Sequence, residues 1–237
     1  IQSWDSSKNF KCAVIVDNMM NLELLTWVSN NGGYPRFGEI ARIHANTTMQ
    51  RQFRPDNAAF HVLDYSLATG TLLRKTTWQG YSDSSAWSRG QGWAVYGYTM
   101  MYRLTKDEKY REQANKIAAF ILNHPNYPKD GIPYWDFDAP NIPDALRDAS
   151  AGALMASAFI ELSDYVTGPL KQKYKIAAET ILTTLSSSQY LATKGTNGGF
   201  LLKHSVGALP LKGEVDVALT YADYYFVEAM LRYLKLL

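Results

Sequence analysis

Stretches of this chain that are apolar on nearly every side alternate with stretches that are apolar along a single stripe. Residues 93–102 read WAVYGYTMMY and residues 151–162 read AGALMASAFIEL, with one charged residue in the two together. Residues 107–123 instead place Tyr110, Ile117 and similar residues on one face and Lys and Glu on the other. A helix that is apolar all round is buried on all sides, whereas a one-sided helix covers a core from outside. The alternation therefore predicts an inner and an outer layer of helices.

The order of these stretches predicts antiparallel helical hairpins. Each of three inner helices is expected to be followed by an outer helix. The expected pairs are 18–28 with 37–51, 88–104 with 107–123, and 148–165 with 171–185. The links inside the second and third pairs are short, and short links make antiparallel neighbours.

Long loops rich in Gly and Pro run from each outer helix to the next inner one. These loops are 55–87, 125–143 and 195–213. They are expected to gather at one end of the inner helices, where functional residues are expected as well. A fourth inner helix at 216–234 has no outer helix after it in the sequence.

The expected fold is therefore all-α, with about seven helices in one domain over residues 1–237. Four helices are inner and three are outer, so they form part of a toroid of hairpins rather than a closed ring. The chain has 237 residues and is 46% hydrophobic, which is enough to bury a core of this kind. A smaller, irregular helical bundle is the alternative.

Composition excludes several classes of function. The net charge is +2, from 24 basic and 22 acidic residues, which gives no support for a nucleic-acid partner. The apolar runs, such as 13–16, are too short to span a membrane. The four histidines have no metal-ligand spacing, and phosphate-loop, dinucleotide and GxSxG motifs are absent. We therefore expect no metal, no cofactor and no membrane or nucleic-acid partner.

Asp17 is the first candidate for chemistry. It follows the apolar residues 13–16 and precedes the helical stretch NMMNLELL, so it is expected to be the N-cap of that helix. The apolar residues before it would partly remove the carboxyl group from water, and this raises the pKa of a carboxyl group. A raised pKa suits a general acid near neutral pH. A purely capping role is the alternative.

Residues 78–93 hold the densest group of sugar-binding residue types. The segment contains three Trp, one Arg and two Gln at the expected start of a helix. Aromatic faces and planar hydrogen-bonding side chains bind sugars, and Arg recognises a carboxylate in a bidentate manner. Alternatively, Arg89 ties loops together and Trp93 belongs to the core.

A second rim segment, 133–140, reads PYWDFDAP, and Arg147 and Asp148 then begin an inner helix. Asp136 or Asp138 could face inward as part of a pocket wall. Equally, this segment could be a structural turn in which Arg147 bonds to loop carbonyl groups.

At these residues the sequence resembles the unsaturated glucuronyl hydrolases, from about Val14 to Arg232. The blocks that carry the resemblance are VDNMMNLELL, RPDNAAFHVLDY, QGYSDSSAWSRGQGW, GIPYWDFDAP, RDASAGALMASA and EVDVALTYADYYFVEAMLR. The related unsaturated rhamnogalacturonyl hydrolases typically have Asn where Gln91 stands, and this favours the glucuronyl group.

The resemblance implies an (α/α)6 barrel and an enzyme that acts on oligosaccharides left by polysaccharide lyases. Such an enzyme removes a 4,5-unsaturated uronic acid from the non-reducing end by hydrating its double bond. By the same resemblance, Asp17 is the catalytic acid and base. The implied substrate-binding residues are His61, Gln79, Trp87, Arg89 and Trp93.

Two departures from the family pattern affect these expectations. The family often has His before the QGY block, where this chain has Trp78. The family also has a second aspartate on an earlier helix, upstream of this chain, so the chain is expected to lack an N-terminal third.

A non-catalytic sugar-binding module and a rhamnogalacturonyl hydrolase are the rival functions. Ser205 or Lys212, in the loop 203–213, could sense sulfation of a second sugar. The sequence predicts neither a compartment nor an oligomeric state.

Overall fold

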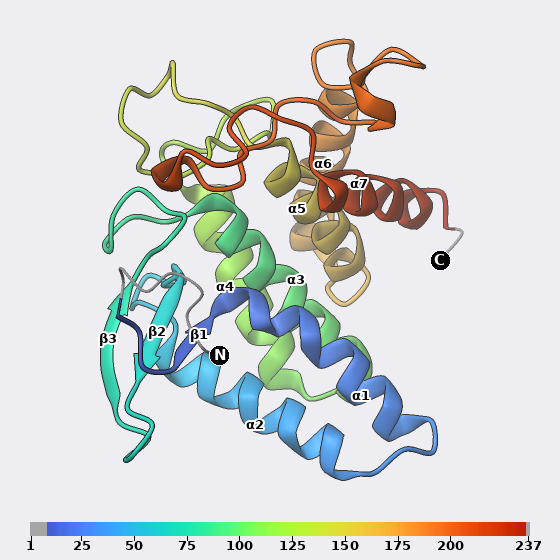
Figure 1. Ribbon diagram of the computed structural model, residues 1–237. Helices are drawn as coiled ribbons and strands as arrows, with labels where there is room; N and C mark the ends of the chain where they lie inside the picture. The colour runs from blue at the N-terminus through green and yellow to red at the C-terminus, as the bar shows by residue number, and fades with distance from the viewer. Residues whose placement is uncertain (1–8, 236–237) are drawn as a thin grey trace.

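The structure, a computed structural model, describes residues 9–235. Seven α-helices form within this range, as Figure 1 shows. They are α1 (Leu22–Asn30), α2 (Arg36–Arg51), α3 (Ser88–Thr105), α4 (Glu108–Asn123), α5 (Ala149–Ser163), α6 (Gly168–Leu185) and α7 (Thr220–Tyr233). A 3-10 helix, Val16–Asn21, leads directly into α1. The helices match the expected stretches to within a few residues at each end.

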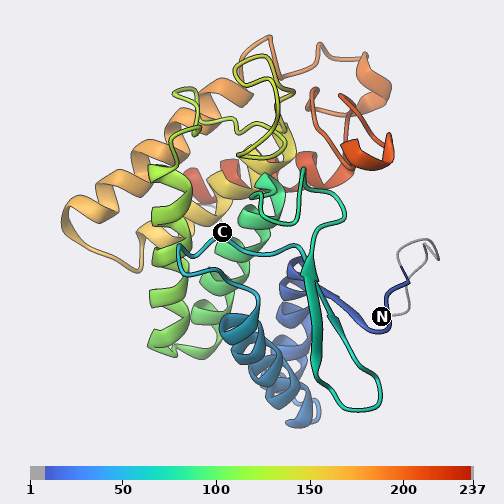
Figure 2. The ribbon, with the colours of Figure 1, turned by 90° about the vertical axis from the view of Figure 1, so that its left-hand side faces the viewer.

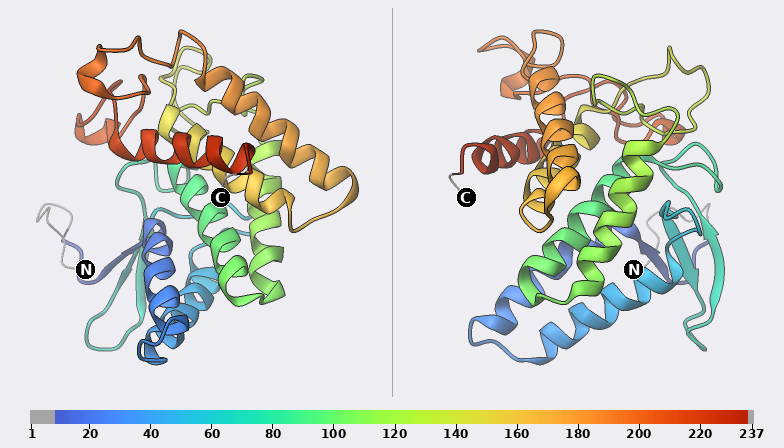
Figure 3. Two further views of the ribbon diagram at one scale, coloured as in Figure 1. Left: turned by 90° about the vertical axis from the view of Figure 1, so that its right-hand side faces the viewer. Right: turned by 180° about the vertical axis from the view of Figure 1, so that it is seen from behind.

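The helices are arranged as the two predicted layers. In the inner layer α3 packs between α1 and α5, and α5 packs between α3 and α7. Each of α2, α4 and α6 packs on the inner helix that precedes it, so three antiparallel hairpins stand side by side (Figures 1 and 3). Gly97 of α3 allows the 3-10 helix to approach closely, because a Cβ at this position would lie 2.6 Å from Cβ of Met19.

Burial divides the inner helices into two kinds. In α3 every residue from Ser88 to Met101 is buried, and α5 is nearly as completely enclosed. In α1 and α7, by contrast, Trp27 is 56% exposed and Tyr224 is 59% exposed. The expectation that these two helices are buried on all sides is therefore wrong for the described residues. The reason is position, because α1 and α7 end the row and each has an inner neighbour on one side only.

A small antiparallel sheet, which the sequence analysis did not predict, lies beside α1 and α2 (Figure 2). Its strands are β1 (Ala13–Ile15), β2 (Val62–Tyr65) and β3 (Leu72–Thr76). Ile15 pairs with Val62, and beyond the pair the Val16 amide donates to the carbonyl oxygen of His61 at 3.0 Å. This register places the beginning of the 3-10 helix next to His61.

The three long loops meet at the end of the molecule where α3 and α5 begin, as Figure 2 shows at the top of the view. Ser85 in the first loop donates to Asp136 in the second at 2.7 Å. Arg89 at the start of α3 donates to the carbonyl oxygen of Gly207 in the third loop at 2.6 Å. The predicted gathering of the loops at one end of the inner helices is therefore confirmed for the last part of the first loop and for the other two, whereas the β2–β3 hairpin of the first loop extends away from that end (Figure 2). Among the described residues, no helix has both the length and the apolar character needed to cross a membrane.

Candidate active site

Asp17 lies in the first turn of the 3-10 helix and is not its N-cap. The cap is Ile15, and it is extended because β1 continues to this point. The ladder of the sheet thus determines where the helix begins, and the expectation that Asp17 is an N-cap is wrong. The Asp17 carboxyl group is left without a capping hydrogen bond to make.

The Asp17 carboxyl group is poorly solvated. Its side chain is 25% exposed, but Oδ2 is buried and has no hydrogen-bond partner among residues 9–235. Burial raises the pKa of Asp17 to about 6, and the nearby Arg89 and Trp93 only partly oppose this rise. The structure thus favours the predicted direction of the pKa shift, and the carboxyl group can hold a proton at mildly acidic pH.

His61 stands beside Asp17 as a neutral hydrogen-bond donor. Its Nδ1 accepts from the backbone N–H of Trp78 at 3.1 Å and of Gln79 at 3.2 Å, so the proton of the neutral ring is on Nε2. Nε2 lies 3.7 Å from Oδ2 of Asp17. Burial, together with the positive charge of Arg89, lowers the pKa of His61 to about 3. The imidazole therefore directs an N–H toward the carboxyl group without adding a charge.

Two tryptophans enclose this pair. The ring of Trp87 packs on His61 at 4.4 Å between centroids, and its side chain is almost fully buried. Trp93 lies further along α3, and its ring is 5.5 Å from that of Tyr225 on α7. The indole Nε1 of Trp93 is buried. Its N–H lies close enough to the Asp17 carboxyl group to lower the pKa of Asp17 by hydrogen bonding, against the larger effect of burial.

Arg89 ties loops together, which was the alternative reading of this residue. It forms an ion pair of 2.8 Å with Asp148 and donates to the carbonyl oxygens of Val206 and Gly207. Its guanidinium group lies over the rings of Trp87, at 4.7 Å, and Tyr221, at 5.2 Å. Contact of Arg89 with a uronate carboxylate stays a prediction.

Gln79 belongs to the same assembly. Its side-chain amide donates to the carbonyl oxygen of Gly207 at 2.9 Å, while its backbone N–H holds the His61 ring. The structure thus brings together Asp17 and all five residues implied to bind substrate. Their contacts with a sugar stay predictions.

The second rim segment is a structural turn. Asp136 is completely buried and accepts from the Tyr81 backbone N–H, the Ser85 hydroxyl and the Asp138 backbone N–H. Arg147 bonds to Asp130 and to the carbonyl oxygen of Ile132. The expectation that Asp136 forms a pocket wall is therefore wrong, because donors from the first loop and from its own loop occupy this carboxylate.

Two residues of the site were missed from the sequence. Asp148 was noted only as the start of a helix, although it holds Arg89. Tyr221 covers the guanidinium group from α7, and its ring is 6.2 Å from that of Trp93. The spacing of Tyr221 and Tyr225, four residues apart on one expected helix, was the available signal for an aromatic face turned toward the site.

The described residues show no metal-binding cluster at this site, and a surface cavity of the molecule lies elsewhere. Residues 9–235 contain no group of three or more His, Cys, Asp and Glu side chains arranged to hold a metal ion. A surface cavity of about 630 Å³ is lined in part by Arg54, Lys75 and Asp83 and also by Asp138, one of the two candidates for a pocket wall. Asp17 and the five implied substrate-binding residues do not line it. Arg54 there bonds to loop carbonyl groups, so the charges of that cavity serve the loops.

The geometry supports proton transfer by one carboxyl group. Asp17 can donate a proton near pH 6 and accept it back, with two N–H groups close by to orient a polar ligand. The other carboxylate of the assembly, Asp148, is engaged by Arg89. Aromatic rings supply an apolar setting around the reacting group.

Comparison with known proteins identifies relatives over nearly the whole chain, although no family model matches it. An unsaturated glucuronyl hydrolase from Formosa agariphila is 47% identical over 233 residues, which cover 98% of this chain and 58% of that protein. An unsaturated chondroitin disaccharide hydrolase from Streptococcus pneumoniae is 32% identical, covering 99% of this chain and 59% of the relative. The chain thus spans about three fifths of the length of these curated relatives.

Solved structures agree in fold. The crystal structure of an unsaturated glucuronyl hydrolase specific for heparin superimposes with a TM-score of 0.94 and 50% identity, covering 100% of this chain and 63% of that one. A mutant of the Streptococcus agalactiae unsaturated glucuronyl hydrolase, complexed with dGlcA-GalNAc6S, gives a TM-score of 0.82 and 32% identity, covering 92% and 58%. The layered helices described above are thus those of the α/α-barrel fold. With this fold, this sequence identity and the site around Asp17, the chain belongs to the family of the unsaturated glucuronyl hydrolases.

Proposed function

We propose that the protein is a glycoside hydrolase that removes a 4,5-unsaturated uronic acid from the non-reducing end of lyase-generated oligosaccharides. The observation that carries this proposal is the Asp17 carboxyl group, whose pKa is raised to about 6 by burial beside a neutral His61. Hydration of an enol ether begins with protonation of carbon, and this requires an acid that keeps its proton near working pH.

The proposed reaction uses one carboxyl group twice. Protonated Asp17 gives its proton to C4, and positive charge develops at C5 and the ring oxygen. Water then adds to C5 while the Asp17 carboxylate takes a proton from it, so the acid is regenerated. The hemiketal that results opens, the glycosidic bond breaks, and the shortened saccharide leaves. This path differs from the two-carboxylate scheme of most glycosidases.

The neighbouring residues have proposed roles in binding. The Nε2–H of His61 and the indole N–H of Trp93 lie where they can donate to sugar or carboxylate oxygens near Asp17. Trp87 and Trp93 offer apolar surface for sugar rings. Gln79 and Arg89 complete the proposed set, and Arg89 also adds positive charge close to the developing anion of Asp17.

The activity is proposed for the whole protein. The chain spans about three fifths of the length of its curated relatives, and the second family aspartate is expected outside it. Residues 1–237 are accordingly proposed as part of a single catalytic domain. Because one solved relative at 50% identity is specific for heparin, we propose unsaturated heparin disaccharides as the first substrates to test.

The test is Asp17→Asn, with loss of the double-bond absorbance as the assay on lyase-generated disaccharides. Removal of the general acid is expected to lower kcat by about 10²–10⁴-fold. Asp164→Asn, at a surface aspartate whose side chain is 67% exposed, is the matched control and should leave the rate unchanged. Near wild-type activity of the Asp17 variant would remove Asp17 from its proposed role.

A non-catalytic sugar-binding module is the second candidate, because Trp87, Trp93 and Arg89 lie together around Asp17 while the second family aspartate is expected outside this chain. Binding and turnover measured on the same oligosaccharide separate the two functions. Binding without turnover in the full-length protein supports the module. Turnover of pectin-derived rather than glycosaminoglycan-derived substrates would instead indicate a rhamnogalacturonyl hydrolase.

A further inference from the structure

Asp148 uses both oxygens of its carboxylate to join three parts of the molecule. Oδ1 accepts from the backbone N–H of Ser150 at 3.0 Å, from its hydroxyl at 2.6 Å and from the Val206 N–H at 3.3 Å. Oδ2 accepts from Arg89 at 2.8 Å. The side chain is fully buried. Capping α5 requires only the bond to the Ser150 N–H, so the other contacts need a separate explanation.

The segment 205–217 is a hairpin whose base rests on this assembly. Its two arms pair at Ser205 with Val217 and at Ala208 with Gly213. They also lie very close together, because a Cβ at Gly207 would be 2.5 Å from Cβ of Glu214. The carbonyl oxygen of Gly207 accepts from both Arg89 and Gln79. The base of the hairpin is thus held by buried side chains of the site.

The tip of the hairpin is in solvent. In the short 3-10 helix Leu209–Leu211 and the following Lys212 only Leu209 is partly buried, and Lys212 has a left-handed backbone with φ of 54°. Leu209 packs on the apolar cluster that contains Val206, so the tip is held near its base and its placement depends on the base.

We infer that Asp148 is a positioning residue that fixes the 205–217 hairpin against the Asp17 site by holding Arg89 and the Val206 N–H. Two independent routes lead from this carboxylate to the hairpin, one direct and one through the guanidinium group. The inference rests on the proposed function for what the positioned hairpin helps to bind, but the clamp itself stands on the contacts alone.

The same ion pair sets the charge seen by Asp17. The groups that face Asp17 are His61, Arg89, Trp93 and Tyr221. His61 directly precedes β2, Arg89 and Trp93 lie on α3, and Tyr221 lies on α7. Burial raises the pKa of Tyr221, so this phenol stays neutral. Loss of the Asp148 charge would leave Arg89 uncompensated and lower the pKa of Asp17. A residue that served only as a helix cap would not have this effect.

The first experiment compares two capping aspartates. Asp148→Ser keeps an oxygen that can accept from the Ser150 N–H, but the shorter side chain cannot reach Arg89. Asp107→Ser is the control. It makes the same change at the N-cap of α4, where Asp107 accepts from the Lys109 N–H. Amide hydrogen exchange is then measured over residues 205–217 in the full protein. We expect at least about tenfold faster exchange in the hairpin for Asp148→Ser and no change there for Asp107→Ser. Exchange within twofold of wild type in both variants would overturn the inference.

A second variant covers the case in which Asp148→Ser does not fold. Asp148→Asn keeps the side-chain volume and one oxygen for the cap while removing the charge that pairs with Arg89. We expect the same faster exchange in the hairpin and a lower NMR titration midpoint for the Asp17 carboxyl group. Unchanged exchange together with an unchanged midpoint would overturn the inference. These readouts do not require turnover, so an inactive wild-type protein would contradict the proposed function while leaving the clamp measurable.

Discussion

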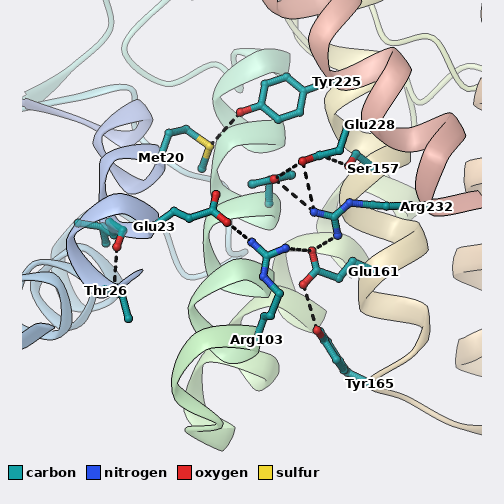
Figure 4. A network of polar contacts seen from close by, with 12 residues as sticks. Met20, Glu23, Thr26, Arg103, Ser157, Glu161, Tyr165, Tyr225, Glu228 and Arg232 are labelled. Atoms are coloured by element: carbon teal, nitrogen blue, oxygen red, sulfur yellow. Dashed lines mark hydrogen bonds and ion pairs between the residues drawn. The ribbon is translucent and has the colours of Figure 1, made fainter. Parts of the chain in front are cut away.

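The two ends of the inner helices differ in whether a carboxyl group removed from water forms an ion pair. At the end where α3 and α5 begin, Asp17 is partly buried next to a neutral histidine, and the nearby cation, Arg89, is already paired with Asp148. Near the other end, a carboxylate and two arginines bind one another directly. There Glu161 of α5 contacts Arg103 of α3 and Arg232 of α7 (Figure 4).

The network at this second end joins all four inner helices. Arg103 also pairs with Glu23 of α1, and Arg232 pairs with Glu228 at 3.4 Å. Figure 4 shows these side chains turned toward one another from the surrounding helices. Although burial opposes it, the carboxylates Glu161 and Glu228 raise the pKa of Arg232, so this side chain keeps its charge. A carboxyl group that is removed from water without a counter-charge keeps its proton and can donate it. A carboxylate that is buried among arginines stays ionised and links the helices that carry them.

The largest test of this contrast is Glu161→Gln. The change removes the carboxylate that joins the two arginines, although Arg103 keeps Glu23 and Arg232 keeps Glu228 as partners. We therefore expect the free energy of unfolding to fall by about 3 kcal/mol, the loss of charge-assisted hydrogen bonds in a partly buried network. Urea denaturation gives this quantity. Glu108→Gln, which breaks an exposed pair with Arg111 on α4, should cost at most about 1 kcal/mol. Equal losses in the two variants would contradict the ionic-link interpretation.

At the Asp17 end, the equivalent change is Asp17→Asn, and it should raise the free energy of unfolding at neutral pH rather than lower it. The folded-state pKa of Asp17, about 6, lies above its ordinary value of 3.8, so the folded state binds this proton more tightly than the unfolded state does. The resulting stabilisation is present below about pH 4 and is lost as the pH rises through 6. Relative to wild type, Asp17→Asn should therefore gain about 2 kcal/mol of unfolding free energy between pH 4 and pH 7.

Unfolding of wild type and variant at the two pH values measures this gain. Asp164→Asn, on the surface, should show no such dependence on pH. A loss of stability in Asp17→Asn at pH 7 would show that the carboxylate is ionised and well solvated in the folded protein.

A third prediction concerns His61, whose neutrality distinguishes the Asp17 end. Because burial lowers the pKa of His61 to about 3, its imidazole should show no titration between pH 5 and 8 by NMR. The folded state disfavours the charged ring, so the stability that this residue contributes is complete above pH 6.5 and declines as the pH falls toward 3. An observed midpoint near 6.5 would place a charged imidazole beside Asp17 and remove the contrast between the two ends.

The smallest expected effect is that of Trp93→Phe. The variant keeps an aromatic ring but loses the buried indole N–H that faces the Asp17 site. Loss of one neutral hydrogen bond to substrate should weaken binding by about fivefold, measured as KM or by calorimetry. Trp27→Phe, at a side chain that is 56% exposed on α1, is the control. Unchanged binding in both variants would assign Trp93 to the core alone.

The helices and their layers could be predicted from the sequence because helical periodicity is a local property. The alternation of all-round and one-sided stretches gave seven helices and three hairpins, and both were observed. The sheet was missed because its strands are three to five residues long, too short for a clear alternating pattern. The exposure of α1 and α7 was also missed, since it depends on which neighbours pack against them rather than on their own residues.

The sequence by itself determined where the helices form, that a carboxyl group follows an apolar segment, and that aromatic residues and Arg89 begin an inner helix. These properties follow from residues close together along the chain. Only the tertiary structure decided that Asp17 stands beside His61, and that Arg89 is held by Asp148, 59 residues away, and by Val206, 117 residues away. Protonation depends on solvent exclusion and on charges within a few ångströms, and distant segments supply both at this site.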